Sequence, residues 1–170
     1  MAVVNLKSVA ITNRDASPEV LNNPSVAGGM VREAIGVVTI GATDTTASTY
    51  RFCELPSNAR ISSIIVNTDA IPGAGSGAID FGLYDITVNG GAVVDAGVFA
   101  PTVDFHTAVL SNKEVAWGSN ESKFSTATKM LWEAEALASD PVKKYDLVGT
   151  LSASNSTGAV VMVVKVQYVV

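Results

Sequence analysis

Few residues of this 170-residue chain could do chemistry, and they stand apart from one another. The chain has one histidine, His106, and one cysteine, Cys53. Nucleophilic catalysis needs a serine or cysteine within reach of a base, but His106 lies in an irregular segment and no Gly-x-Ser-x-Gly motif occurs. Cys53 lies in an apolar run and is typical of a small buried hydrophobe. The sequence therefore predicts that the protein is not an enzyme.

The sequence also offers few residues that could bind a metal ion or a cofactor. With one histidine and one cysteine, a tetrahedral zinc site would need carboxylates for at least two ligands. Calcium stays an alternative, because several aspartates follow predicted strands or lie in loops, although none has the spacing of a calcium-binding loop: Asp69, Asp80, Asp85, Asp95 and Asp104. The glycine-rich segment 73–77 lacks the Lys-Ser/Thr ending of a phosphate-binding loop. We expect no metal and no cofactor.

The elements that would position any site are short β-strands separated by turn residues. Apolar and β-branched runs predict strands over 35–42, 48–55, 59–68, 78–88, 144–153 and 159–170. Because these strands follow one another closely and no β-α-β rhythm occurs, they favour antiparallel pairing. The predicted fold class is all-β, a sandwich or barrel that is jelly-roll-like.

Further predictions concern the segments between and within these strands. The spacing of apolar residues predicts one short helix over 126–138, and a second helix is weakly favoured over 92–100, ending at Pro101. The polar stretch 103–124 is predicted to be a surface loop with one short strand, in which Trp117 could anchor a partner. The last two strands are predicted to form a hairpin.

The first 34 residues differ from the rest of the chain. They carry ten sizeable aliphatic or thioether side chains, yet Pro18, Pro24 and the pair Gly28-Gly29 interrupt any helical or strand period. Their three cations are balanced by three anions, unlike a solvated tail. The sequence therefore predicts two parts: an extended N-terminal arm over 1–34 and a single β-rich body domain over 35–170.

An arm that is too apolar for water and too broken to fold alone needs another surface. We expect it to bind a partner through apolar and basic side chains, with a strand added to a neighbour's sheet edge as one way to satisfy its backbone. The alternative is a strand of the same domain that wraps over its own core. The candidate partner-binding residues are Leu6, Val9, Ile11, Arg14, Val20, Leu21 and Arg32.

The charge balance limits the partners. The net charge of −5 lies on the body, whose acidic surface would repel phosphate backbones, so nucleic acid is not an expected partner. The apolar run over 158–170 is interrupted by Lys165 and Gln167, and the N-terminus lacks the pattern of a secretory signal, so neither membrane insertion nor secretion is expected. The glycosylation-type triplets at Asn120 and Asn155 are therefore interpreted as polar turns.

Several segments of the sequence resemble those of a known protein family. They are Tyr50-Arg-Phe-Cys-Glu-Leu-Pro-Ser-Asn-Ala-Arg-Ile61, Ile79-Asp-Phe-Gly-Leu-Tyr-Asp85, Asn89-Gly-Gly-Ala-Val-Val-Asp-Ala96, Leu131-Trp-Glu133, Ala138-Ser-Asp-Pro141 and Tyr145-Asp-Leu147. From about Arg32 to the C-terminus, the chain is similar to head decoration (cement) proteins of tailed bacteriophages. These segments are structural and include no catalytic signature.

The resemblance implies a β-rich body on the outer face of an assembled capsid, commonly as a homotrimer, with extended segments that clamp neighbouring subunits. The implied partners are the major capsid protein and further copies of this chain, on a virion that assembles in the host cytoplasm. Two other functions stay open: a tail or baseplate component, and a carbohydrate-binding β-sandwich on the virion surface.

Overall fold

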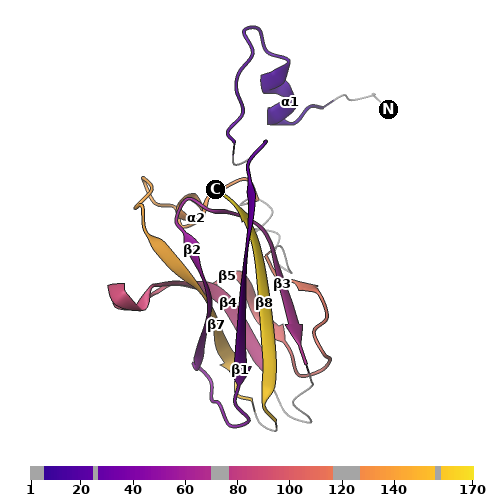
Figure 1. The fold of residues 1–170 in the computed structure, drawn as a ribbon, viewed down its shortest axis with the longest axis vertical. Helices are drawn as coiled ribbons and strands as arrows, with labels where there is room; N and C mark the ends of the chain where they lie inside the picture. The colour runs from indigo at the N-terminus through magenta and orange to yellow at the C-terminus, as the bar shows by residue number, and fades with distance from the viewer. Residues whose placement is uncertain (1–5, 25–26, 70–76, 117–126, 156–157) are drawn as a thin grey trace.

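Two four-stranded antiparallel sheets packed face to face make up the body of the protein. The structure is a computed structural model, and it describes residues 6–24, 27–69, 77–116, 127–155 and 158–170. Sheet A has the strand order β1-β8-β3-β6, and sheet B has the order β2-β7-β4-β5 (Figure 1). The prediction of an all-β antiparallel fold is confirmed, and the architecture is a sandwich, not a closed barrel.

The predicted strands are present with small changes at their ends. The strands of sheet A are β1 (Val31–Ile40), β3 (Arg60–Thr68), β6 (Lys113–Glu114) and β8 (Val160–Val169). Those of sheet B are β2 (Thr49–Pro56), β4 (Ala78–Asp85), β5 (Val93–Asp104) and β7 (Lys144–Ala153). A 3-10 turn, η1 (Thr87–Asn89), lies between β4 and β5.

Consecutive strands mostly alternate between the two sheets, and this is the arrangement of a jelly roll. The predicted C-terminal hairpin is therefore wrong, because β7 lies in sheet B between β2 and β4 while β8 lies in sheet A between β1 and β3. Each strand has two hydrogen-bonded neighbours in its own sheet and buries an apolar face in the core between the sheets. The first and last strands of the body, β1 and β8, pair along their whole length without a bulge.

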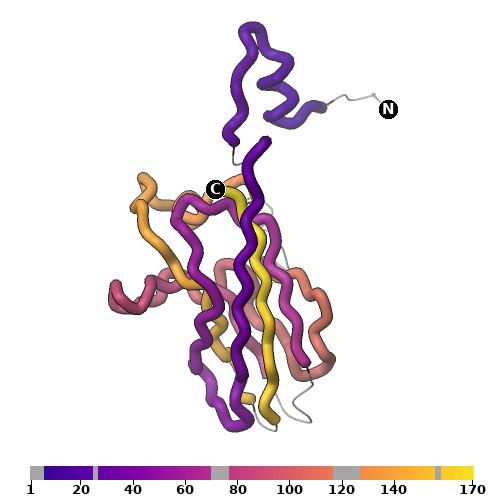
Figure 2. The backbone as a smooth tube through the Cα atoms, in the orientation of Figure 1, coloured from indigo at the N-terminus to yellow at the C-terminus, as the bar shows by residue number. Residues whose placement is uncertain are grey.

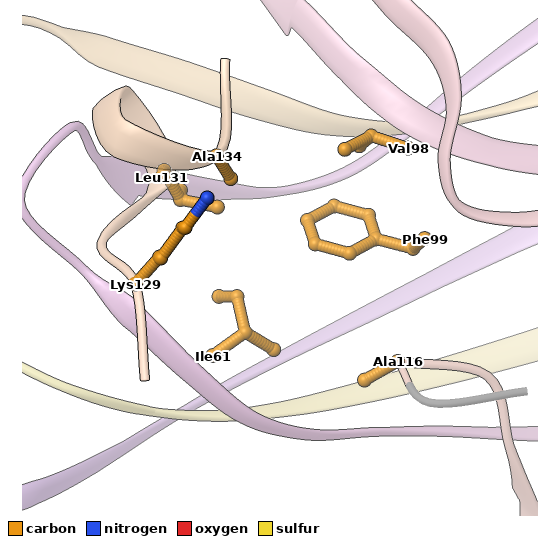
Figure 3. A pocket seen from close by; sticks show the side chains of 7 residues that line it. All are labelled: Ile61, Val98, Phe99, Ala116, Lys129, Leu131 and Ala134. Carbon is orange, nitrogen blue, oxygen red and sulfur yellow. The ribbon is translucent and has the colours of Figure 1, made fainter. Parts of the chain in front are cut away.

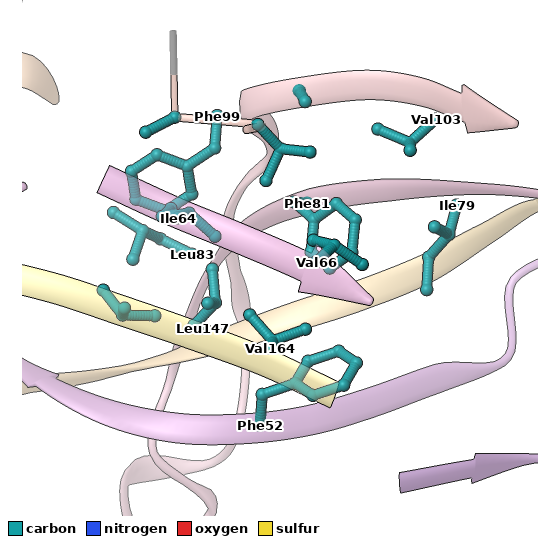
Figure 4. Close-up of a cluster of buried hydrophobic side chains, with 14 of the residues drawn as sticks. Phe52, Ile64, Val66, Ile79, Phe81, Leu83, Phe99, Val103, Leu147 and Val164 are labelled. Carbon is teal, nitrogen blue, oxygen red and sulfur yellow. The ribbon is translucent and has the colours of Figure 1, made fainter. Parts of the chain in front are cut away.

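The core lies between the sheets and draws on both. Large apolar side chains such as Phe81 and Leu147 from sheet B face Ile64 and Val164 from sheet A (Figure 4). In β8, the residues Val160, Met162, Val164 and Val166 are fully buried, as the alternating sequence predicts. In β4, the alternation is less complete than predicted, because Tyr84 on the opposite face is also buried, at 5% exposure.

The segment 92–100, for which a helix was weakly favoured, is part of the long strand β5. It pairs with β4 through three register shifts, and this pairing outweighs the local preference. Pro101 does not end the element, because β5 is the edge strand of sheet B, where a missing N–H leaves no ladder bond unmade.

The predicted surface loop over 103–124 is partly exposed and partly buried where the structure describes it. Phe105, Leu110 and Val115 are buried, at 0%, 8% and 1% exposure. The Leu110 N–H donates to the Thr68 hydroxyl and the Thr68 N–H donates to the Leu110 carbonyl, so the segment is tied to sheet A. The single short strand predicted here is β6, and Trp117 lies outside the described residues.

The predicted helix over 126–138 is reduced to one turn, α2 (Leu131–Ala134). Its N–H groups at Leu131 and Trp132 donate to the carbonyls of Ala59 and Ser57 in the β2–β3 turn, so this turn of helix covers one end of the sandwich. Beyond it, Ala136 has a φ of 54°, a left-handed conformation that ends the helix. Thr126 lies outside the described residues.

Candidate partner-binding surface

The N-terminal segment forms a small hook beyond the end of the sandwich. Helix α1 (Val9–Arg14) begins at Ser8, whose hydroxyl accepts from the Ile11 N–H at 3.4 Å. Figures 1 and 2 show α1 and the segment that follows it lying off the end of the body at which the C-terminus also lies. The arm was predicted to be extended, so this helical turn is a correction. It forms because residues 8–14 contain neither proline nor glycine.

Hydrogen bonds between its own residues hold the hook together. The Asn13 amide donates to the Asn22 side chain at 2.9 Å, and the Asn22 amide donates to the Ala10 carbonyl at 3.2 Å. The Val20 N–H donates to the Asn13 carbonyl at 3.1 Å. These bonds bring the segment around Val20 back alongside α1.

A small ion cluster adds to the hook. The carboxylate of Asp15 accepts from Lys7 at 2.8 Å and from Arg14 at 2.9 Å. The hydrogen bonds from Lys7 and then from Arg14 hold the pKa of Asp15 below its ordinary value. The Lys7 and Arg14 side chains are more than half exposed and the Asp15 side chain is one third exposed, so these ion pairs contribute little to stability.

The apolar side chains of the hook are not covered by the body. Leu6, Val9 and Leu21 are 90%, 76% and 89% exposed, Val20 is half exposed, and no residue of α1 is buried. Single exposed apolar residues are ordinary on protein surfaces, but several gathered on one small segment mark an interaction site. The structure thus places six of the seven candidate residues on one hook: Leu6, Val9, Ile11, Arg14, Val20 and Leu21.

Arg32 is the exception. Strand β1 begins at Val31, so Arg32 lies in sheet A opposite Tyr168 of β8 and not in the hook. Residues 31–34 thus follow the alternative weighed for the arm, a strand of the body itself. No run of apolar residues marked this boundary in the sequence, because Arg32 and Glu33 interrupt it.

The residues of the body that were considered for catalysis or metal binding have structural roles. Burial raises the pKa of the Cys53 thiol to about 12, with a smaller contribution from the charge of Asp146. Three of the aspartates weighed as calcium ligands use a carboxylate oxygen to accept a backbone N–H: Asp69 from Val161, Asp80 from Thr102, and Asp104 from His106. Among the described residues, no three His, Cys, Asp or Glu side chains are grouped as a metal site would require.

The hollows of the body are small or shallow. The pocket in Figure 3 lies between α2, β3 and β5, is lined mainly by Ile61, Phe99 and Leu131, and has a volume of about 30 Å³. Ligand sites usually enclose roughly 300–1,000 Å³. A larger hollow of about 280 Å³ between β5 and β6 is lined by Val103, Leu110 and Val115, with no aromatic side chain among its lining residues.

The described aromatic residues offer no platform for a sugar. Every one of them is buried or half-buried, including Trp132 and Tyr168. Carbohydrate-binding sites stack sugar rings on exposed aromatic faces. The described part of the chain shows no exposed aromatic face of that kind. Within that same part, no helix has the length and apolar character needed to span a bilayer.

Comparison with known proteins adds information on the fold. No known protein-family profile matches the chain, and no curated protein matches it. A chain in the "Capsid of Ralstonia phage GP4" is similar to it in structure, with a TM-score of 0.57 and 13% sequence identity, over 83% of this chain and 84% of that chain. A chain of the "Cyanophage Pam1 capsid asymmetric unit" matches with a TM-score of 0.48 and 14% identity, over 92% of this chain and 96% of that chain. At such identities the likeness to the GP4 chain establishes a shared fold.

Proposed function

We propose that this chain is a non-enzymatic structural protein of a tailed-bacteriophage virion, which binds the outer face of the assembled head and stabilises it. The observation that carries the proposal is the hook, which exposes Leu6, Val9 and Leu21 at 76–90% on a segment that the body does not cover. The resemblance in the sequence supports the same role, as does the shared fold with a chain from a phage capsid.

The mechanism follows from the weakness of each contact. Burying one leucine contributes about 1.5–3 kcal/mol, so one hook offers modest affinity once its ordering is subtracted. A shell presents the same surface many times, and copies that also bind one another gain from avidity. The major capsid protein is the expected partner. The trimer implied by the resemblance remains a prediction, and a measurement of the mass of the free protein in solution tests it.

The test compares two matched double variants on heads isolated without this protein. Leu6→Asp with Leu21→Asp removes two side chains that are 90% and 89% exposed, and Val88→Asp with Val142→Asp changes two body residues that are 91% and 86% exposed. Loss of about 3–6 kcal/mol per copy should weaken head binding by roughly 10²- to 10⁴-fold for the hook variant. The body variant should bind as the wild type does. Equal binding by both would contradict the role of the hook.

A truncation needs a boundary that spares the sheet. Deleting residues 1–34 would remove residues 31–34 of β1, which pair with the end of β8, so loss of binding could reflect damage to sheet A. Deleting residues 1–29 leaves β1 whole and should give a folded body that no longer decorates heads. Electron microscopy of labelled particles then distinguishes the head from the tail or baseplate as the place of binding.

A further inference from the structure

The outer faces of the two sheets differ in chemistry. On sheet A, the side chains that point away from the core include Ile35 and Val37 from β1, Val161 and Val163 from β8, and Ile65 from β3. We call these five residues the sheet A patch. Strand pairing places Val37 directly opposite Val163, and it places Lys165 opposite both Ile35 and Ile65, so the apolar side chains of the patch surround one lysine.

The two β1 residues of the patch are exposed to solvent. Ile35 is 59% exposed and Val37 is 60% exposed, in the middle of a regular strand. The side chain of a β-branched residue in the middle of a strand usually packs against other apolar side chains. Two such side chains in solvent therefore indicate a surface that a partner covers. In Figure 1, β1 and β8 lie side by side in front of sheet B, with no other element of the chain drawn across them.

Charge separates the two faces further. The charge of Lys165 within the patch is balanced, because its ammonium pairs with Glu33 at 2.9 Å and Gln167 donates to the same carboxylate at 3.2 Å. Sheet B and the loop before it instead carry three ion pairs, each at 2.6 Å: Arg51–Asp146, Lys143–Asp85 and Lys144–Glu54. Covering sheet A therefore desolvates one ion pair among apolar side chains, which costs less than desolvating the three pairs of sheet B.

The patch extends towards the N-terminal segment. Met30 and Val31, at the start of β1, are 71% and 59% exposed. Val31 lies on the same face of β1 as Ile35 and Val37, so exposed apolar side chains run along this face from the point where the N-terminal segment enters the sheet.

From these observations we infer that the sheet A patch is the face through which the body contacts the same shell surface that receives the hook. This inference rests on the proposed function and specifies it. The surface that fits is flat and mainly apolar over the width of two strands, with room for the Lys165–Glu33 pair, and sheet B faces away from it into solvent.

The first test is a matched pair of substitutions. Val37→Lys places a charge in the patch, and Val93→Lys places the same charge on β5 of sheet B, where Val93 is 58% exposed. Neither side chain belongs to the core, so both variants should fold, and equal thermal midpoints would establish this. On heads that lack the protein, Val37→Lys should lower the affinity at least about tenfold, while Val93→Lys should stay within about twofold of the wild type.

The second test leaves the sequence unchanged. Lys165, within the patch, and Lys144, on sheet B, have side chains that are 40% and 59% exposed. An amine-acetylating reagent applied to the free protein and to decorated heads should label Lys165 severalfold more slowly on the heads and Lys144 at the same rate in both.

The outcomes separate this inference from the proposed function. If the wild-type chain does not bind heads at all, the proposed function fails. If it binds, but both valine variants bind equally and Lys165 keeps its labelling rate, the hook acts without the patch and this inference is overturned. It is also overturned if Val37→Lys abolishes self-association while leaving head affinity unchanged, because the occupant of the patch would then be a second copy.

Discussion

Gly36, in the middle of β1, lies where the backbone of sheet A passes very close to that of sheet B, and this approach predicts a large effect from a single methyl group. A Cβ built at Gly36 would lie 2.2 Å from the Phe52 carbonyl oxygen and 2.7 Å from the Phe52 Cα. Both atoms belong to the backbone of β2, so no side-chain rotation can relieve the contact. Gly36→Ala must therefore push β1 away from β2.

The expected cost follows from the packing. Overfilling a packed interior costs typically about 1–3 kcal/mol, partly offset by the lower entropy that alanine gives the unfolded chain. For a domain of this size, each 1 kcal/mol moves the thermal midpoint by roughly 2–4 °C, so Gly36→Ala should lower it by roughly 2–12 °C. Thermal and urea unfolding measure this change.

Gly97 supplies the control. The nearest atom to a Cβ at Gly97 is the Pro101 Cβ at 3.8 Å, an ordinary contact, so Gly97→Ala should be neutral or slightly stabilising. Equal stability of the two variants would refute the reasoning, because it would mean that β1 and β2 do not approach each other as the structure has them.

Three further predictions concern the body. Arg51→Met loses an ion pair with Asp146 at 2.6 Å and hydrogen bonds to two carbonyls, and should lower the free energy of unfolding in urea by about 1–3 kcal/mol. Lys144→Met removes a solvent-exposed ion pair and should match the wild type. Burial raises the pKa of Cys53 from 9.0 to about 12, so the thiol of the unfolded chain ionises first and stability should fall as the pH rises from 9 towards 12. In thermal melts at several pH values, Cys53→Ala should flatten that fall. An unchanged slope would contradict the burial of the thiol. Asn155, 2% exposed, donates to the carbonyls of Gly41 and Gly158, both at 2.7 Å, so Asn155→Ala should cost about 1–3 kcal/mol, and a midpoint within 1 °C of the wild type would count against these bonds.

The strands could be predicted from the sequence because their signal is local. Alternation in β8 and turn residues such as Pro56-Ser57-Asn58 place the ends of most strands within a few residues. Sheet membership depends on partners far along the chain, so the hairpin between β7 and β8 was a reasonable but wrong prediction. The segment 92–100 failed for the same reason, since its pairing with β4 decides its conformation.

The candidate surface was predicted in part. Composition alone marked the hook, because Leu6, Val9 and Leu21 have no period that would bury them. The sheet A patch was missed, since Ile35 and Val37 sit in a run where Ile40 is fully buried, and sequence cannot tell which β-branched residues face outward until the partner strand is known.

The pairing of β1 with β8 has a consequence for how the protein is made. The first strand of the body finds its ladder partner far along the chain, so sheet A cannot close during synthesis until β8 has left the ribosome. Folding must then bring distant segments together, which is slow for topologies rich in non-local pairs. A nascent chain stalled before Val160 should remain open to proteolysis, and co-expression with a chaperone should raise the yield of soluble protein more than a lower growth temperature does.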